Sequence, residues 1–187
     1  MKTVVGVLYG TVVFEPEVRQ DDHGFVSCTF DAEIADGAGL DSRAFVQDCH
    51  TRTPRGRVRG LHIRTDGGEG KLVRCVHGSV VNVAVDLRPT SPTYRLWMTV
   101  VLDDVTHRSV WLPAGLAHGF QALTETADVC TRINRIHRAE YDITIRPDDP
   151  DLGIPWPLPL TGPLDDEEPP ALAVVEPMLS EWFGEVL

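Results

Sequence analysis

Lysine is nearly missing from this sequence of 187 residues, in which it occurs only as Lys2 and Lys71 among 17 basic residues. The four cysteines form no C-x-x-C pair and match no zinc spacing, which argues against a zinc module and favours reduced thiols in a cytosolic protein. No apolar run approaches the roughly 20 residues that a membrane-spanning helix needs. No G-x-G-x-x-G motif, P-loop or long repeat occurs, so the common nucleotide-binding loops are excluded as well.

The charge of the chain is unevenly distributed. Its net charge of −11 comes almost entirely from residues 147–187, which contain ten acidic residues and neither Lys nor Arg. An acidic chain is unsuited to non-specific nucleic-acid binding. Residues 1–146 are nearly neutral, however, so they could still bind an anionic small molecule. The apolar start lacks a small-x-small cleavage site and soon meets Glu15 and Glu17. We therefore expect a first β-strand and a cytoplasmic protein without a membrane partner.

Length and patterning indicate one all-β domain. The chain has 42% hydrophobic and 24% charged residues, as in a single globular domain. Short β-branched segments separated by turn residues recur without helix–strand alternation, which predicts about eight to ten strands in an antiparallel sandwich or barrel. Residues 33–40 are interpreted as a loop or a weak helical turn. The expected strands are residues 4–13, 25–30, 57–64, 71–76, 80–87, 95–102, 110–112 and 127–136.

The end of the chain has a different character. Residues 148–170 are rich in proline and acidic residues and should lie extended on the surface. Apolar residues then follow a helical spacing, which predicts a short helix docked on its own domain or on a neighbouring subunit; they are Met178, Leu179, Trp182, Phe183, Val186 and Leu187. We divide the chain into a main domain at residues 1–160 and, within the same domain, an extension with a docking helix at residues 161–187.

His62 and Lys71 are the strongest candidates for chemistry. They fall on two consecutive expected strands, and side chains of such strands can meet inside a barrel wide enough for one small ligand. A neutral histidine suits the removal of a proton next to a carbonyl group. A lysine ammonium suits the stabilisation of the resulting enolate oxygen. Because the chain otherwise uses arginine, an internal lysine is less easily explained as a surface residue.

A second motif, P-A-G-L-A-H at residues 113–118, matches the later half of a cupin signature. Metal-binding cupins combine such a histidine with an earlier H-x-H pair and a glutamate. Here Arg64 stands two residues after His62, so His62, Glu69 and His118 leave an incomplete ligand set, and we expect no metal. Arginines at 55, 57 and 59 share one face of an extended segment. They suit either a phosphate group or a charged, solvated strand edge.

Nine short motifs follow one another in an order that resembles a known enzyme family. They are V-Q-D (46–48), R-G-L-H (59–62), G-K-L-V-R (70–74), V-A-V-D-L-R (83–88), S-P-T (91–93), W-L-P (111–113), A-H-G-F (117–120), D-D-P (148–150) and L-G-I-P-W-P-L (152–158). Over roughly residues 10–160 the chain resembles the dTDP-4-keto-6-deoxyglucose 3,5-epimerases of deoxysugar biosynthesis. The resemblance implies a cupin-type jelly-roll barrel with short peripheral helices and a C-terminal helix, a homodimer with exchanged N-terminal strands, and neither metal nor cofactor.

The resemblance also implies roles for individual residues. His62 corresponds to the base that removes the proton next to the C4 ketone, and Lys71 to the residue that stabilises the enolate. Spacing from the G-I-x-W-P segment places the carboxylate that orients the base at Glu168. The family's remaining substrate contacts fall on Arg59, which meets the diphosphate, and on Gln47, His118, His23, Cys49 and His137.

Several positions depart from the family pattern. The tyrosine that returns a proton to the opposite face of the sugar is replaced by Thr131, whose hydroxyl is shorter and a much weaker acid. His137, Cys130 or a water would then have to supply that proton. The R-G-F-F-x-E motif becomes H-G-F-V-S-C at residues 23–28, and the asparagine after V-Q-D becomes Cys49.

Three hypotheses remain. The first is an isomerase that epimerises a dTDP-linked or other nucleotide-linked 4-keto-6-deoxyhexose, at one carbon or two. The second is a repurposed cupin isomerase, cyclase or lyase that enolises a carbonyl compound without a nucleotide. The third is a non-catalytic binding protein, which the retained His62 and Lys71 argue against because an unused buried charge is costly.

Overall fold

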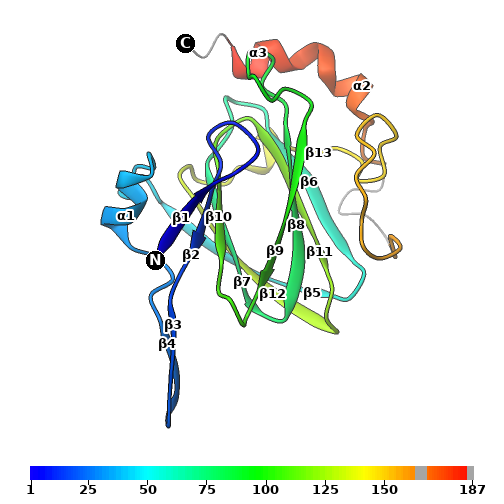
Figure 1. Cartoon of the computed structure of the whole chain (residues 1–187). Coiled ribbons are helices and arrows are strands. Elements are labelled where there is room, and N and C mark those ends of the chain that lie inside the picture. Colours follow the sequence, from blue (N-terminus) through cyan, green and yellow to red (C-terminus); the bar gives the residue numbers. More distant parts are fainter. Residues whose placement is uncertain (163–167, 185–187) are drawn as a thin grey trace.

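The computed structural model describes residues 1–162 and 168–184. Within these residues the strands form two antiparallel sheets that face each other and one separate hairpin (Figure 1). In spatial order, the six-stranded sheet contains β1 (Lys2–Val5), β2 (Val12–Glu15), β10 (Ser109–Leu112), β7 (Lys71–His77), β12 (Thr126–Ile133) and β5 (Gln47–Pro54). The five-stranded sheet contains β13 (Asp142–Thr144), β6 (Val58–Arg64), β11 (Leu116–Ala122), β8 (Ser79–Asp86) and β9 (Trp97–Asp103).

Strand alternation divides the apolar side chains of β8 between two of the three apolar cores. On β8, Val80 and Ala84 pack between the sheets, whereas Val83 and Val85 pack on the outer face of the five-stranded sheet. Successive residues of a strand point to opposite faces, so a strand buried on both sides needs the unbroken apolar run that the sequence has here. The same rule decides which polar side chains of the neighbouring strands point inward.

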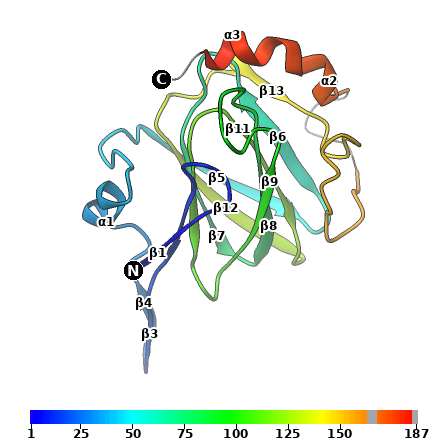
Figure 2. The ribbon, with the colours of Figure 1, turned by 45° about the horizontal axis from the view of Figure 1, so that its top comes forward.

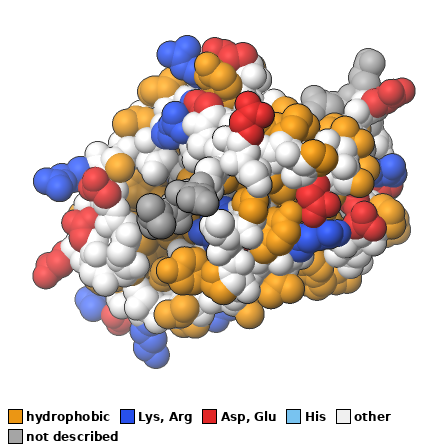
Figure 3. All heavy atoms as spheres, turned by 90° about the horizontal axis from the view of Figure 1, so that it is seen from above, with side chains coloured by type: hydrophobic (Ala, Val, Ile, Leu, Met, Phe, Trp, Pro, Cys, Tyr) orange, Lys and Arg blue, Asp and Glu red, His pale blue; other side chains and the backbone are white. Residues whose placement is uncertain are grey.

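The C-terminal segment covers the outer face of the five-stranded sheet. It contains α2 (Leu172–Val175), the short 3-10 helix η2 (Glu176–Met178) and α3 (Leu179–Phe183). Their apolar side chains belong to the outer core, so the predicted docking helix packs on its own domain; the buried ones are Leu172, Val175, Leu179 and Phe183. The helical segment begins earlier than expected, and Val186 and Leu187 lie outside the described residues. On the end of the molecule that carries these helices, charged side chains of both signs are interspersed with apolar ones (Figure 3).

The N-terminal apolar run forms two strands instead of the single strand expected at residues 4–13. Gly6 N donates a hydrogen bond to Thr11 O at 2.9 Å, and Gly10 has a φ of 81°, which favours glycine. These two features reverse the chain, so that β1 and β2 pair with each other. The segment at residues 33–40 contains the helix α1 (Ala32–Gly37), whose first turn is capped by Asp31 Oδ1 accepting from Ile34 N.

Four strands lie outside the expected ranges, namely β3 (Val18–Asp21), β5, β11 and β13. β5 lies at a sheet edge and alternates exposed and partly buried residues with few apolar ones, yet it pairs with β12 along its whole length. β13 has only three residues and follows the 3-10 helix η1 (Ala139–Tyr141). Both strands carry residues of the site described below.

The hairpin of β3 (Val18–Asp21) and β4 (Gly24–Ser27) extends away from the two sheets (Figures 1 and 2). Phe25 and Val26 near its tip are 53% and 66% exposed. The predicted all-β architecture with short peripheral helices and a C-terminal helix is confirmed, with one difference: in the described part of the chain the two sheets do not join into one closed barrel. None of the helices described here has the length and apolar character needed to cross a membrane.

Candidate active site

A cavity of about 380 Å³ lies between the two sheets. Strand alternation explains most of its lining, because β11 turns its even-numbered residues inward and β7 and β12 their odd-numbered ones. On β6 both Arg59 and His62 reach the cavity, because the register of its pairing with β11 shifts between them. Most of the lining side chains are polar. The lining residues are Cys49, Thr51, Arg59, His62, Glu69, Lys71, His118, Phe120, Thr131, Ile133, His137 and Asp142.

His62 lies in this cavity with a carboxylate beside it. Its Nδ1 is 3.4 Å from Asp142 Oδ2 and 3.3 Å from Thr144 Oγ1. Burial disfavours the ionised form of Asp142, but the hydrogen bond and charge of His62 outweigh it and hold the pKa of that carboxyl below its usual value. With Nδ1 engaged by these two oxygens, Nε2 of the same ring is the atom suited to take a proton.

His118 lies directly opposite His62 in the pairing of β11 with β6. Its Nε2 is 2.7 Å from Asn82 Oδ1, and its side chain is buried. Burial, reinforced by the nearby charges of Lys71 and His62, holds the pKa of His118 well below its ordinary value. The ring is therefore neutral at pH 7, with its Nε2 proton donated to the Asn82 carbonyl oxygen.

Lys71 is the first residue of β7, and its side chain is largely buried in the cavity wall. Its Nζ is 3.4 Å from Glu69 Oε1, and the Glu69 side chain is buried as well. Thus a cation, a histidine with a carboxylate partner and a neutral histidine share one small space. This combination can remove a proton from carbon and stabilise the negative charge that develops on a nearby oxygen.

Thr131 and Cys49 are paired neighbours on β12 and β5, and both line the cavity. Cys130 points to the other face of the same sheet, where it lines a small hollow with Arg74 and Arg132. Burial raises the pKa of the Cys130 thiol. Strand alternation therefore removes Cys130 from the candidates for a proton donor in this cavity.

Arg59 also reaches the cavity, and its Nε donates to Thr53 Oγ1 at 3.1 Å. Gln47 lies just outside the lining: its Oε1 accepts from the backbone N of His137 at 3.0 Å and so anchors the segment that brings His137 to the cavity. His23 is exposed at the turn of the β3–β4 hairpin and is not among the described lining residues.

Glu168 does not have the place expected for it. It is exposed and is not one of the described residues that line the cavity, whereas Asp142 lies against His62. Sequence spacing could not reveal Asp142, because the three-residue strand that carries it has no recognisable pattern. The only local indication of a role for Asp142 is that Thr144, two residues further on, lies on the same face of the strand and also contacts His62.

A metal centre finds no support among the side chains that the structure describes. They contain no group of three or more His, Cys, Asp and Glu residues placed to hold a metal ion. Glu69 faces Lys71 and Arg64, and His118 faces Asn82, so two of the three ligands considered from the sequence are engaged elsewhere.

Comparisons with known proteins agree on one family. The family model for dTDP-4-dehydrorhamnose 3,5-epimerase matches residues 7–181. The protein of that name from Methanothermobacter thermautotrophicus is 43% identical over 157 residues, which cover 84% of this chain and 84% of that relative.

Two solved structures are informative. The dTDP-6-deoxy-D-glucose-3,5-epimerase of Legionella pneumophila, solved with dTDP-4-keto-L-rhamnose, has a TM-score of 0.88 and 32% identity, covering 95% of this chain and 96% of that one. A 3'-monoepimerase of Streptomyces bikiniensis, solved with dTDP-quinovose, has a TM-score of 0.83 and 31% identity, covering 92% of this chain and 88% of that one. The cupin-type fold expected from the sequence is confirmed by these likenesses. The chain belongs to the dTDP-4-dehydrorhamnose 3,5-epimerase family, whose members are carbohydrate epimerases of the isomerase class.

Proposed function

We propose that this chain epimerises a dTDP-linked 4-keto-6-deoxyhexose at a single carbon next to the ketone. The observation that carries this proposal is the meeting of His62, backed by Asp142, with Lys71 in one cavity. The family supports the substrate class. The solved relatives hold dTDP sugars and include both 3,5-epimerases and a 3'-monoepimerase.

In the first step His62 Nε2 takes a proton from the carbon next to the ketone. The C–H bond breaks, its electron pair forms the enolate double bond, and the carbonyl electrons move to oxygen. Asp142 balances the imidazolium charge that appears on His62. The Lys71 ammonium stabilises the enolate oxygen by charge and hydrogen bonding.

In the second step a proton returns to the same carbon from the opposite face. The Thr131 hydroxyl is too weak an acid and too short to do this alone. His137 lines the cavity, and an imidazolium is a competent acid near neutral pH. We assign the return of the proton to His137. Inversion at one carbon needs only one such donor, and the solved relatives include a 3'-monoepimerase.

Arg59 is assigned to the diphosphate, because a guanidinium fork matches phosphate oxygens and its side chain reaches the cavity from β6. The family also leads us to expect a homodimer. Light scattering on the purified protein measures this directly, and a monomer at micromolar concentration would contradict it.

The proposed reaction is tested by turnover of dTDP-4-keto-6-deoxyglucose, with proton spectra that report the configuration at C3 and C5 of the sugar. We expect inversion at one carbon, and its loss in His62→Ala. His50→Ala is the matched control, because His50 is an exposed histidine on β5 that is not among the described lining residues. Full turnover by folded His62→Ala protein would refute the proposal.

A second candidate is the enolisation of a carbonyl compound without a nucleotide. It is favoured by the altered hairpin motif at residues 23–28 and by Thr131, which remove groups that the family directs at its nucleotide sugar. Competition separates the two candidates: dTDP should inhibit or bind if the first is correct, and neither effect should occur if the second is.

A further inference from the structure

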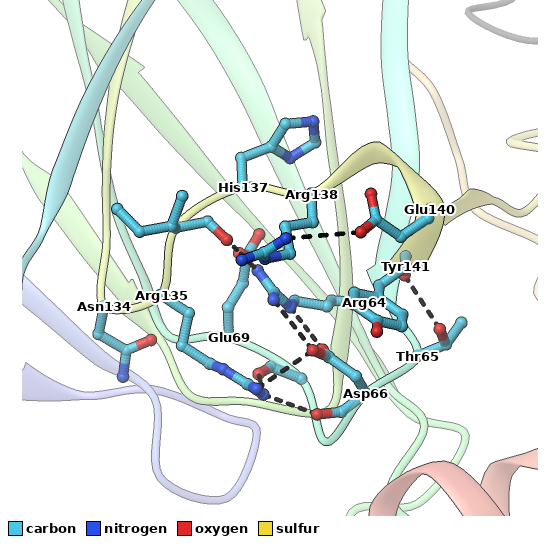
Figure 4. Close-up of polar contacts among 12 residues, drawn as sticks. Arg64, Thr65, Asp66, Glu69, Asn134, Arg135, His137, Arg138, Glu140 and Tyr141 are labelled. Carbon is cyan, nitrogen blue, oxygen red and sulfur yellow. Dashed lines mark hydrogen bonds and ion pairs between the residues drawn. The ribbon is translucent and has the colours of Figure 1, made fainter.

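A line of alternating charges leads from the cavity to the surface, and Figure 4 shows four of its members, Glu69, Arg64, Asp66 and Arg135. Lys71 Nζ is 3.4 Å from Glu69 Oε1, and Glu69 Oε2 is 3.3 Å from Arg64 Nη1. Arg64 also forms a two-pronged contact with Asp66, whose Oδ2 lies 3.1 Å from Arg135 Nη2. Glu69 is thus the one anion of this line that contacts the cavity lysine directly.

The inner members of this line are buried. The side chains of Arg64, Glu69 and Lys71 are 6%, 7% and 10% exposed. Buried charges are costly unless each has partners, and removing one partner leaves the other uncompensated. The hydrogen bond with Asp66 raises the pKa of Arg64, so the guanidinium is a permanent cation behind Glu69. The arrangement is therefore a built unit, with each charge placed by its neighbours.

The backbone fixes Glu69 relative to Lys71. Glu69 lies in the loop that leads into β7, and Lys71 is the first residue of that strand. Between them, Gly70 N donates to Asn134 Oδ1 at 2.7 Å, and a side chain at Gly70 would collide with Trp111. The carboxylate therefore contacts the ammonium from the loop before β7, at the wall of the cavity that both side chains line.

The outer part of the unit holds the segment that carries His137. Arg64 Nη1 donates to Ile136 O at 2.6 Å, and Arg135 Nη1 donates to Asp66 O at 2.7 Å. One connected set of charges therefore supports both Lys71 and the loop next to it.

We infer that Glu69, held in place by Arg64, is the positioning residue that directs the Lys71 ammonium toward the carbonyl oxygen of the bound keto sugar. The inference rests on the proposed function. Charge counting supports it, because the line of five residues carries three cations and two anions. An enolate formed beside Lys71 would be the third anion next to three cations, so the charges of the line would then balance.

The scarcity of lysine makes this inference directly measurable. Lysine labelled with ¹³C at Cε gives signals from Lys2 and Lys71 only, and the position of each signal reports the surroundings of that ammonium in the absence of substrate. The titratable and charged groups that line the same cavity as Lys71 are Cys49, Arg59, His62, Glu69, His118, His137 and Asp142.

In Glu69→Gln, which keeps the shape of the side chain, we expect the Lys71 signal to move because the ammonium loses the carboxylate 3.4 Å away, and the Lys2 signal to stay unchanged. We expect kcat to fall about tenfold with little change in KM. In a Lys71→Met background, Glu69→Gln should have no further effect on kcat. Glu15→Gln is the matched control, since Glu15 pairs with Arg108 at 2.8 Å and is not among the described lining residues.

Arg64→Gln removes the cation that holds Glu69 in place, so the Lys71 signal should again move and kcat should again fall. An unchanged Lys71 signal in folded Glu69→Gln, or an equal loss of kcat in the Lys71→Met background, would overturn the inference. If the Lys71 signal responds as expected but the wild type shows no turnover of dTDP-4-keto-6-deoxyglucose, the proposed function fails and the contact between Glu69 and Lys71 stands.

Discussion

Replacing Asp142 by asparagine should lower kcat by about ten- to a hundredfold. Asp142 Oδ2 lies 3.4 Å from His62 Nδ1. Two unit charges at that separation attract by about 5 kcal/mol at an effective dielectric constant near 20. The two side chains are 29% and 25% exposed, so solvent reduces the attraction to about 1.5–3 kcal/mol, which corresponds to the stated range of rates.

This attraction exists in full only after His62 has taken the proton. The asparagine side chain of the variant can still accept a hydrogen bond from Nδ1, so the ring orientation should be kept while the charge balance is lost. We therefore expect the loss in kcat, with KM nearly unchanged, when dTDP-4-keto-6-deoxyglucose is the substrate. Asp148→Asn is the control, because Asp148 is an exposed aspartate that pairs with Arg146 at 2.8 Å.

The reasoning is refuted if folded Asp142→Asn turns over within twofold of the wild type across the pH range. A rise in KM at constant kcat would contradict it too, since that result assigns Asp142 to substrate binding rather than to the charge on His62.

Three further predictions follow from the structure. Thr131→Tyr should raise epimerase activity and add inversion at a second carbon, and a well-folded variant without either gain would mean that the sugar lies differently. The lowered pKa of His118 means that the unfolded chain binds a proton which the folded chain does not, so stability should fall as pH drops below the ordinary value of 6.5. Asn82→Asp should raise the pKa of His118 and so weaken the dependence of the free energy of unfolding on pH, which urea titrations at several pH values measure. An unchanged pH dependence would show that another group causes the loss of stability. Leu179→Ala should destabilise the fold by about 3 kcal/mol because Leu179 is fully buried between α3 and the five-stranded sheet, and a loss below about 1 kcal/mol would contradict its role in the outer core.

Part of the cavity follows from strand parity, which can be read from the sequence once the strands are assigned. Lys71 and Thr131 fall on expected strands, and their odd numbers place them between the sheets. His118 lies on β11, which was not expected as a strand, and His62 reaches the cavity only through the register shift between β6 and β11. The functional contrast between Thr131 and Cys130, one facing the cavity and one facing away, has the same origin.

The remainder depended on contacts that no local pattern encodes. Asp142 meets His62 only because β13 pairs with β6 in one register, and a three-residue polar strand gives no periodic signal. β5 was missed because an edge strand needs few apolar residues. Spacing alone led to Glu168, but spacing cannot account for the path of a proline-rich segment through space. Glu69 was considered as a metal ligand, but its carboxylate contacts the buried Arg64 and Lys71.

The most direct test of the account is solvent deuterium incorporation. The protein is incubated with dTDP-4-keto-6-deoxyglucose in heavy water, and the mass and proton spectra of the sugar are followed for the wild type and for His62→Ala. The account predicts incorporation of deuterium at one carbon next to the ketone, dependent on His62, with inversion at that carbon. Absence of incorporation by folded wild-type protein, or equal incorporation by His62→Ala, would contradict the claim that His62 and Lys71 enolise a nucleotide-linked keto sugar in this cavity.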